Sequence, residues 1–331
     1  MPFLTGNELE KVYGRARKSG YGFIASNIVE PNILIGLLSA ANEKDSDLVL
    51  QMSNGASKFA GDGDPISGLR AMSNYINELA ERYEFGVFLN MDHLKESNMD
   101  LIKAAIDEEL VSSIMIDASK ESFEDNVRIT REVVDYAEGS GVLIEGELGK
   151  IKGVEDEDTA SAEAFYTDPG EAVEYVNRTG IDLLAVSVGT QHGVSKGKDI
   201  ELRVDLVKEI NETLENEGCG IPLVLHGSSG LVKEQLVQVL DYGVCKLNKD
   251  TRYQYEYARA ALDFYFEHRD SVLPPEGVKD DREGFFSDTD WSPVKSDFDP
   301  RVVSRVIRER IKETAENLFE QAGSVNKSLY T

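Results

Sequence analysis

The chain has 331 residues, 41% of them hydrophobic, and a formal net charge of −26 from 61 acidic and 35 basic side chains. This length can build a large core, as one barrel or as two domains, and the negative surplus would repel nucleic acids and anionic membranes. The acidic residues are spread along the whole chain among well-formed apolar segments. That distribution argues against disorder and indicates a solvated acidic surface of the kind found in halophilic proteins.

The two cysteines and the N-terminal sequence give information on the cellular compartment of the protein. Cys219 lies in a glycine-flanked turn and Cys245 in an apolar run, so no disulfide framework is indicated and a reducing environment is expected. The N-terminus lacks the long apolar core of a signal peptide. No apolar stretch approaches the ~20 residues that a membrane span needs. We therefore expect a cytoplasmic protein without membrane partners.

Eight short apolar runs recur along the chain: YGFIASNI (21–28), DLVLQMS (47–53), GVFLNMD (86–92), VSSIMID (111–117), GVLIEGE (141–147), DLLAVSV (182–188), IPLVLH (221–226) and GVCKLNK (243–249). Between them lie stretches with apolar residues at helical spacing, such as DLIKAAIDEEL. Near-continuous apolar runs favour parallel strands that are covered on both faces. Eight such units predict an α/β fold, a closed (β/α)8 TIM barrel forming one domain over residues 1–331. An open doubly wound sheet is the alternative.

The C-terminal part departs from this repeat. A helix is expected at about 251–268, then an irregular acidic segment over 269–300 and a last helix at about 301–322. A loop of that length is usually functional or packs on a neighbour. We expect residues 269–331 to form a loop-and-helix extension that packs on the barrel or on a neighbouring subunit.

Polar side chains stand at or just after the end of every predicted strand. In such a barrel the site is built at the C-terminal ends of the strands. Any one of these residues could be structural, but a full ring of them predicts a functional site at one rim. They are Asn27, Ser53, Asn54, Asp92, His93, Asp117, Glu145, Glu147, His192, His226, Asn248 and Asp250.

Three of the four histidines, His93, His192 and His226, belong to this ring. Three imidazoles converging on an open mouth indicate a catalytic divalent-metal site with a position left for substrate. Nitrogen ligands favour Zn²⁺, with Co²⁺, Fe²⁺ or Mn²⁺ as substitutes. Asp117 and Glu147 suit either outer partners of the ligands or a second metal position. The fourth histidine, in FYFEHRDS, is expected to be a solvated or capping residue at a helix end.

The segments HGSSGLVKEQL and NKDTRYQYEYA each lead from a strand into a helix. Loops after the seventh and eighth strands of a barrel often bind phosphate through backbone N–H groups at helix starts. The alternative is that Ser228, Ser229 and Thr251 are ordinary N-caps. A metal, a phosphate pocket and several acids indicate carbonyl chemistry, in which a ketone is polarised and an acid moves a proton on the neighbouring carbon. Metal-dependent hydrolysis competes, but the His-x-His that ends the first strand of amidohydrolase barrels is absent.

Eight motifs, in order from about residue 20 to 301, resemble the class II, metal-dependent fructose-bisphosphate aldolases: QMSNGAS, MDH, SSIMIDASKESFEDNV, IEGELG, VGTQHG, VLHGSSG, KLNKDT and DPR. The resemblance implies a lyase of glycolysis and gluconeogenesis. It would reversibly cleave fructose 1,6-bisphosphate to dihydroxyacetone phosphate and glyceraldehyde 3-phosphate. The implied cofactor is Zn²⁺ or another divalent transition metal, with room for a monovalent cation such as K⁺. The implied assembly is a homodimer or higher homo-oligomer.

The resemblance also implies residue roles. His93, His192 and His226 would bind the metal, with Glu147 as an alternative ligand and Asp117 beside a second metal position. Asp92 would exchange a proton with the C4 hydroxyl, and Glu155 or the nearby Glu157 would take the proton from dihydroxyacetone phosphate. The implied substrate contacts are Gly193, Gly227, Ser229, Asp250 and Thr251 for the C1 phosphate, Asn248 for the enediolate, Asn27 and Ser53 for the other end of the substrate, and Arg301, from the neighbouring subunit, for the C6 phosphate.

Three other functions compete with this interpretation. A tagatose-bisphosphate aldolase differs only in the C4 stereocentre, which sequence spacing does not encode. A Schiff-base aldolase would use Lys246, which lies inside a predicted strand. A non-catalytic sugar-phosphate-binding barrel is disfavoured by the presence of Asp92 and Glu155.

Overall fold

The computed structural model describes residues 3–151, 166–191, 193 and 201–331. Its eight parallel strands pair in chain order, and the last strand pairs with the first to close a barrel. The predicted (β/α)8 barrel is therefore confirmed, and each strand begins inside one of the eight apolar runs. The strands are β1 (Phe23–Asn27), β2 (Leu48–Ser53), β3 (Val87–Leu94), β4 (Ser113–Ile116), β5 (Leu143–Leu148), β6 (Leu183–Val186), β7 (Leu223–Leu225) and β8 (Val244–Lys249).

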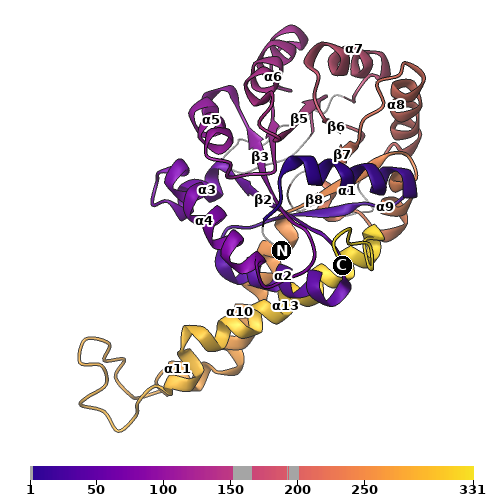
Figure 1. The fold of residues 1–331 in the computed structure, drawn as a ribbon. Coiled ribbons are helices and arrows are strands. Elements are labelled where there is room, and N and C mark those ends of the chain that lie inside the picture. The colour runs from indigo at the N-terminus through magenta and orange to yellow at the C-terminus, as the bar shows by residue number, and fades with distance from the viewer. Residues whose placement is uncertain (1–2, 152–165, 192, 194–200) are drawn as a thin grey trace.

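Helices surround the barrel (Figure 1). Proline occupies the first turn of α2, α4, α7 and α13, where its missing N–H costs nothing. The helices are α1 (Gly6–Ser19), α2 (Pro31–Lys44), α3 (Asn54–Ala60), α4 (Pro65–Ala80), α5 (Met99–Asp107), α6 (Phe123–Ala137), α7 (Pro169–Thr179), α8 (Val204–Asn216), α9 (Lys233–Leu240), α10 (Thr251–Glu267), α11 (Arg269–Val272), α12 (Lys295–Phe298) and α13 (Pro300–Ala322), with 3₁₀ turns η1 (Glu96–Asn98) and η3 (Ser228–Gly230).

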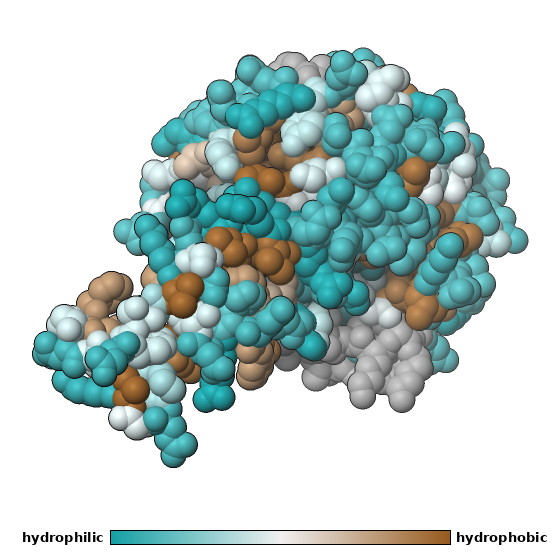
Figure 2. Space-filling view, turned by 90° about the horizontal axis from the view of Figure 1, so that it is seen from below, coloured by the Kyte–Doolittle hydropathy of each residue, from teal (hydrophilic) through white to brown (hydrophobic). Residues whose placement is uncertain are grey.

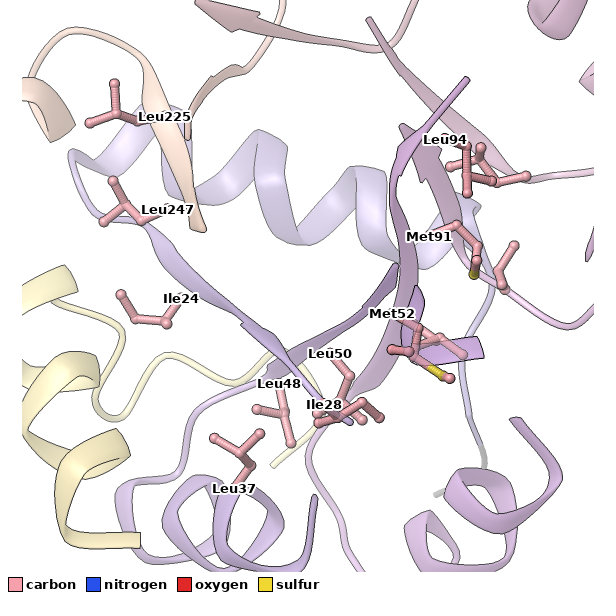
Figure 3. Packing of buried hydrophobic residues seen from close by; sticks show 14 of the residues in the cluster. Ile24, Ile28, Leu37, Leu48, Leu50, Met52, Met91, Leu94, Leu225 and Leu247 are labelled. Carbon is pink, nitrogen blue, oxygen red and sulfur yellow. The ribbon is translucent and has the colours of Figure 1, made fainter. Parts of the chain in front are cut away.

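Two apolar layers hold the strands in place. The outward side chains of the strands, such as Leu50 and Met91, pack against the helices (Figure 3). The inward side chains of the lower half, such as Val49 and Phe88, form a separate cluster with α1. The alternation of inward and outward residues along each strand is what divides one apolar run between the two layers.

The C-terminal tail closes the N-terminal end of the barrel together with α1. The Asp47 carboxylate accepts hydrogen bonds from the Ser328 hydroxyl at 2.8 Å and from the Leu329 backbone N–H at 3.0 Å. The Tyr330 ring lies 6.4 Å from the ring of Phe88. This end of the barrel is therefore filled, and access to the interior is left to the opposite rim.

Helices α10 and α13, with α11 and the segment that follows it, form an arm that projects from the barrel (Figure 1). The final helix packs along α2 and α10. Hydrophobic residues are visible on the arm surface in Figure 2. The exposed large apolar residues of this part of the chain include Leu262, Phe266, Leu273, Phe285 and Val294. In the described part of the chain, no helix is both long and apolar enough to span a bilayer.

Candidate active site

A bulge at the end of β3 aims two functional side chains at the barrel mouth. The register of β3 against β4 shifts between Met91 and Leu94, and His93 has φ 49°, in the left-handed region. The His93 N–H donates to the Met115 sulfur at 3.4 Å. Bulges and left-handed residues of this kind commonly re-aim side chains at functional sites. Here the bulge explains how the adjacent Asp92 and His93 both face one mouth.

His226 follows β7 and is fully buried. Its Nε2 lies 2.8 Å from Glu145 Oε1, and the amide of Asn248 donates to its Nδ1 at 3.0 Å. Both contacts fix the same tautomer, with the proton on Nε2 and a lone pair on Nδ1. Burial and the neighbouring His93 lower the pKa of His226, so the ring is neutral, as a metal ligand must be.

Glu145 in turn is held by Lys246, whose Nζ lies 2.6 Å from Glu145 Oε2. Both side chains are buried. Burial alone would raise the pKa of Glu145, but the Lys246 charge and the His226 hydrogen bond lower it to about 2. Lys246 is thus the partner of a buried carboxylate, which disfavours its alternative role as a Schiff-base nucleophile.

The two imidazoles that the structure describes at the rim meet directly. His93 Nε2 lies 2.7 Å from His226 Nδ1, with the rings nearly perpendicular. Since the Nδ1 lone pair faces His93, a cation can take the place of the proton that otherwise joins the two rings. Donor atoms of Asp92, His93 and His226 lie within 4.8 Å of one another. This nitrogen-rich set fits a divalent transition metal.

The Asp92 carboxylate lies beside this pair and accepts two amide hydrogen bonds. Asn27 donates to Oδ2 and Asn248 donates to Oδ1, each at 3.1 Å. Asp92 is 2% exposed. Its oxygens are therefore fixed in position next to the candidate metal donors, a placement that suits a proton-transferring group.

A second acidic pair lies behind His93. Its Nδ1 is 3.6 Å from Asp117 Oδ2 and 4.0 Å from Glu147 Oε2, and Ser119 bridges the two acids. Burial raises the pKa of Asp117, but His93 and Ser119 outweigh that effect and hold the pKa well below its usual range. The acids thus orient His93 from the side opposite His226, and with His93 they also form a second donor group.

The turn after β7 and the start of α10 lie beside the metal donors. Gly227 has φ 60°, and a Cβ there would meet the Gln191 backbone at about 2.7 Å, so the close approach of these two loops requires glycine. Ser228 donates its hydroxyl to the Asn248 carbonyl at 2.8 Å. Asp250, not Thr251, is the N-cap of α10, and it makes no side-chain cap bond. In the other loop, Gly227 is the N-cap of η3 and Val232 is the N-cap of α9. Ser228, Ser229 and Thr251 are therefore not the N-caps of these helices.

Comparisons with known proteins agree with this geometry. A family model described as fructose-bisphosphate aldolase class-II matches residues 7–327. The chain belongs to the class II fructose-bisphosphate aldolase family. The fructose-bisphosphate aldolase of Giardia intestinalis is 34% identical over 303 residues, covering 83% of this chain and 86% of that protein. That of Geobacillus stearothermophilus is 36% identical over 257 residues, covering 77% and 84%.

Among solved structures, the fructose-bisphosphate aldolase of Campylobacter jejuni superposes with a TM-score of 0.83 at 27% identity, covering 99% of this chain and 97% of that one. The resemblance carried by the eight sequence motifs is thus confirmed along nearly the whole chain. Class II aldolases are metal-dependent lyases that act on sugar phosphates, so the enzyme class expected from the sequence is confirmed as well.

Within this aldolase, some predicted site residues lie apart from the cluster or outside the described residues. Ser53 ends β2, and its hydroxyl accepts from the Ala56 N–H as the cap of α3. Arg301 lies in the first turn of α13; its side chain is 80% exposed and pairs with Asp299. His192, Glu155 and Glu157 fall outside the described residues.

The remaining histidine, His268, caps the C-terminal end of α10 and stacks on Phe264, as expected for a residue outside the site.

The structure adds residues that the sequence did not single out as a unit. Ser113, Asn90 and Gln51 continue the hydrogen-bonded chain from Asn27 into the barrel interior, with donor–acceptor distances of 2.7–3.0 Å. All three are buried. In the sequence, each of the three is a polar residue within an otherwise apolar run, at a position that faces into the barrel. Buried amides in a connected network are a means of fixing side-chain positions.

Proposed function

We propose that this aldolase reversibly cleaves fructose 1,6-bisphosphate at a metal centre held by His93, His226 and His192, with Asp92 moving the proton. The observation that carries the proposal is the placement of the Asp92 carboxylate beside two converging imidazoles in one buried mouth. Zn²⁺ suits the nitrogen donors best. When bound, the divalent ion would polarise the ketone of the substrate and stabilise the charge that develops on its oxygen.

The chain's own residues prepare this site before substrate arrives. Glu145 holds the proton of His226 on Nε2, so that Nδ1 faces the mouth as a ligand atom. Asp117 and Glu147 orient His93 from behind, or hold a cation at a second position. Carboxylates that hydrogen-bond to ligand histidines generally fix ring orientation and raise basicity.

Asp92 acts as the base in the cleavage direction. It accepts the proton of the C4 hydroxyl, the C4–O bond becomes a carbonyl, and the C3–C4 bond breaks with its electron pair left on C3. Glu155, or Glu157 two residues on, then delivers a proton to C3 to give dihydroxyacetone phosphate. In the condensation direction the same groups exchange their roles. The two amides on Asp92 orient its oxygens for this transfer.

The remaining proposed residues bind the phosphate and hydroxyl groups of the substrate. We assign the C1 phosphate to the backbone and side chains of Gly193, Gly227, Ser229, Asp250 and Thr251, at the turn after β7 and the start of α10. Asn248 stabilises the enediolate, and Asn27 and Ser53 contact the remainder of the substrate. A monovalent cation such as K⁺ beside the phosphate would suit this acidic protein.

We further propose that the enzyme is a homodimer or larger homo-oligomer in which residues 269–331 reach a neighbouring copy. Arg301 lies on the arm, away from the rim cluster of its own chain, and its guanidinium is largely exposed. Exposed Phe266 and Phe285 on the arm offer apolar surface for such a contact. In that assembly Arg301 would bind the C6 phosphate of the neighbouring site.

The acidic composition supports a halophilic enzyme of the cytoplasm. A net charge of −26 repels itself in the compact state and repels an anionic substrate. Concentrated salt shortens the screening length from ~30 Å at 0.01 M to ~3 Å at 1 M and weakens both effects. The fold and the turnover should therefore both gain from molar KCl.

The experiment that tests the function is a cleavage assay with fructose 1,6-bisphosphate and tagatose 1,6-bisphosphate side by side, before and after chelation and metal repletion. We expect cleavage of the fructose isomer to predominate, to disappear with EDTA and to return with Zn²⁺. Predominant cleavage of the tagatose isomer would reassign the substrate. Activity that survives complete metal removal would contradict the metal mechanism, and absence of cleavage of either isomer would favour the non-catalytic alternative.

A further inference from the structure

Lys249 is a buried cation that the aldolase site does not use. It pairs in register with Ser26, whose hydroxyl contacts Tyr253 of α10, so this position of β8 faces out of the barrel towards the helices. The Lys249 side chain is 1% exposed. Its Nζ donates to the Ser228 carbonyl in the turn after β7. An ammonium group has three N–H donors, and this contact uses one of them.

A cavity of about 380 Å³ lies beside Lys249, bounded by η3, α9, α10 and α13. Its lining shares Ser229 with the phosphate turn but includes neither the metal donors nor Gly227, Asn248, Asp250 or Thr251. The cavity is therefore behind the barrel mouth and separate from it. A volume of this size can hold a phosphate group or a small phosphate ester.

The charge of this cavity is opposite to that of the molecule. Its ionisable lining residues are four basic and two acidic side chains, which give a surplus of two positive charges when Lys249 is protonated, in a chain with a net charge of −26. They are Lys233, Lys249, Arg252, Arg310, Glu256 and Glu313. A surplus of this sign and size matches an oxyanion of charge −2.

Ion pairs account for only part of the cationic lining. Glu256 lies 2.9 Å from Arg252 and 3.6 Å from Arg310, and Glu313 lies 3.4 Å from Arg310. Lys249 has no carboxylate among its contacts in the described part of the chain. Burial and the Arg252 charge lower the pKa of Lys249 to about 7, and an anion beside Nζ would restore its charged form.

We propose that this cavity is a second binding site of the aldolase, for a phosphate-class dianion, with Lys249 at its floor and Arg252 and Lys233 at its opening. The dianion would satisfy the remaining donors of Lys249 and neutralise the positive surplus. Because Lys249 also holds the Ser228 carbonyl, the bound anion would brace the turn that follows His226. The site does not depend on which sugar phosphate the barrel mouth cleaves.

The test is equilibrium binding of inorganic phosphate to the full-length, metal-loaded protein at constant ionic strength. It would be run on wild type, Lys249→Met, Arg252→Gln and Lys208→Gln, with parallel titrations using glycerol 3-phosphate and chloride. Lys208 pairs with Glu212 on α8 and does not line the cavity, so Lys208→Gln is the matched loss of one positive charge. Crystals soaked in tungstate would locate the bound oxyanion by its anomalous signal.

We expect wild type to bind a phosphate at the cavity in addition to any at the mouth. Lys249→Met should weaken this site about 10-fold or more, Arg252→Gln should weaken it less, and Lys208→Gln should not change it. Binding of phosphate but not glycerol 3-phosphate would restrict the ligand to the free ion. Tungstate density at the mouth alone, or unchanged phosphate binding in both Arg252→Gln and a folded Lys249→Met, would overturn the proposal. If Lys249→Met does not fold, phosphate binding by Arg252→Gln and the position of the bound tungstate test the proposal in its place.

Discussion

Along β3, Phe88 points into the lower half of the barrel, and Asp92, four residues later, points into the upper half. The same change occurs on β7, where Val224 belongs to the lower apolar cluster and His226 to the mouth. The two environments therefore follow each other along a strand within one or two inward positions, since inward residues recur every second position. The lower half is closed by α1 and the C-terminal tail, whereas the upper half holds the candidate active site.

The two halves of the barrel differ in what their buried side chains contribute, stability in one and chemistry in the other. Apolar burial in the lower half contributes free energy of folding. The upper half buries carboxylates, amides and imidazoles, which would destabilise the fold if they lacked partners. There the continuous hydrogen-bonded chain from Ser113 to Lys246 satisfies most of these groups and fixes their geometry. Substitutions in the two halves should therefore affect different measurements.

The largest effect is expected from His226→Ala. Loss of this imidazole would remove a proposed metal ligand and the lone pair that faces His93, so activity should fall by at least ~10³-fold and metal content should fall with it. Metal analysis and cleavage rates of the purified variant check this. His268→Ala, at the end of α10, is the control and should keep both. Wild-type metal content and activity in His226→Ala would show that the site is misassigned.

Asp92→Ala should separate metal binding from proton transfer. The variant should retain metal and bind dihydroxyacetone phosphate, but cleavage should drop by roughly 10²–10⁴-fold, as for loss of a general acid–base group. Metal analysis, product binding and single-turnover cleavage measure the three properties. Near-normal cleavage with bound metal would remove Asp92 from the mechanism.

In the lower half, Phe88→Ala should lower the stability of the fold and leave metal binding unchanged. Removing this buried ring should reduce the free energy of unfolding by ~3–5 kcal/mol because it leaves a cavity in the inner cluster. Metal affinity of the folded fraction should stay close to wild type. Denaturant unfolding and metal titration below the transition test this. A selective loss of metal with stability unchanged would break the proposed division of the barrel.

A smaller effect is expected from the double variant Glu145→Gln with Lys246→Met. Changing both residues avoids an unpaired buried charge, while His226 loses its anionic partner. Metal affinity should fall about 10–100-fold, measured by competition with a chelator. The matched control, Lys44→Met with Glu320→Gln, removes a surface ion pair of similar length and should not alter metal binding. Equal affinity in the two double variants would leave Glu145 without a positioning role.

The smallest effect is expected from salt concentration, which acts on the stability and activity of the whole molecule. Melting temperature and cleavage rate should both rise from about 0.05 to 3 M KCl as the surface charge is screened. Differential scanning calorimetry and steady-state assays over this range provide the measurement. Greatest stability and activity at the low end would mean that the acidic surface has another purpose.

The sequence predicted the barrel and the rim because both follow from simple patterns. Eight apolar runs are visible without a structure, and parallel strands place their C-terminal residues at one end. The bulge at His93 was not predictable, since it depends on the register against β4. A second register shift lies between β7 and β8 near Val224. For this reason the sequence alone did not predict that Lys246 points into the barrel and Lys249 out of it.

The polar interior was harder to foresee. Gln51 and Asn90 appear in the sequence as single interruptions of apolar strands, and nothing local tells that their amides meet across the barrel. Glu145 was visible as a strand-end acid, but its bonds to both His226 and Lys246 join residues 81 and 101 positions apart. Such contacts depend on closure of the barrel and not on local propensity.

We assign the metal centre to the rim cluster of the upper half, Asp92, His93 and His226. Anomalous diffraction at the absorption edge of bound Zn²⁺ tests it most directly, on crystals of the metal-loaded protein without added substrate. We expect one strong peak beside His93 Nε2 and His226 Nδ1, adjacent to Asp92. A fully loaded, active crystal whose metal lies away from both imidazoles would contradict it.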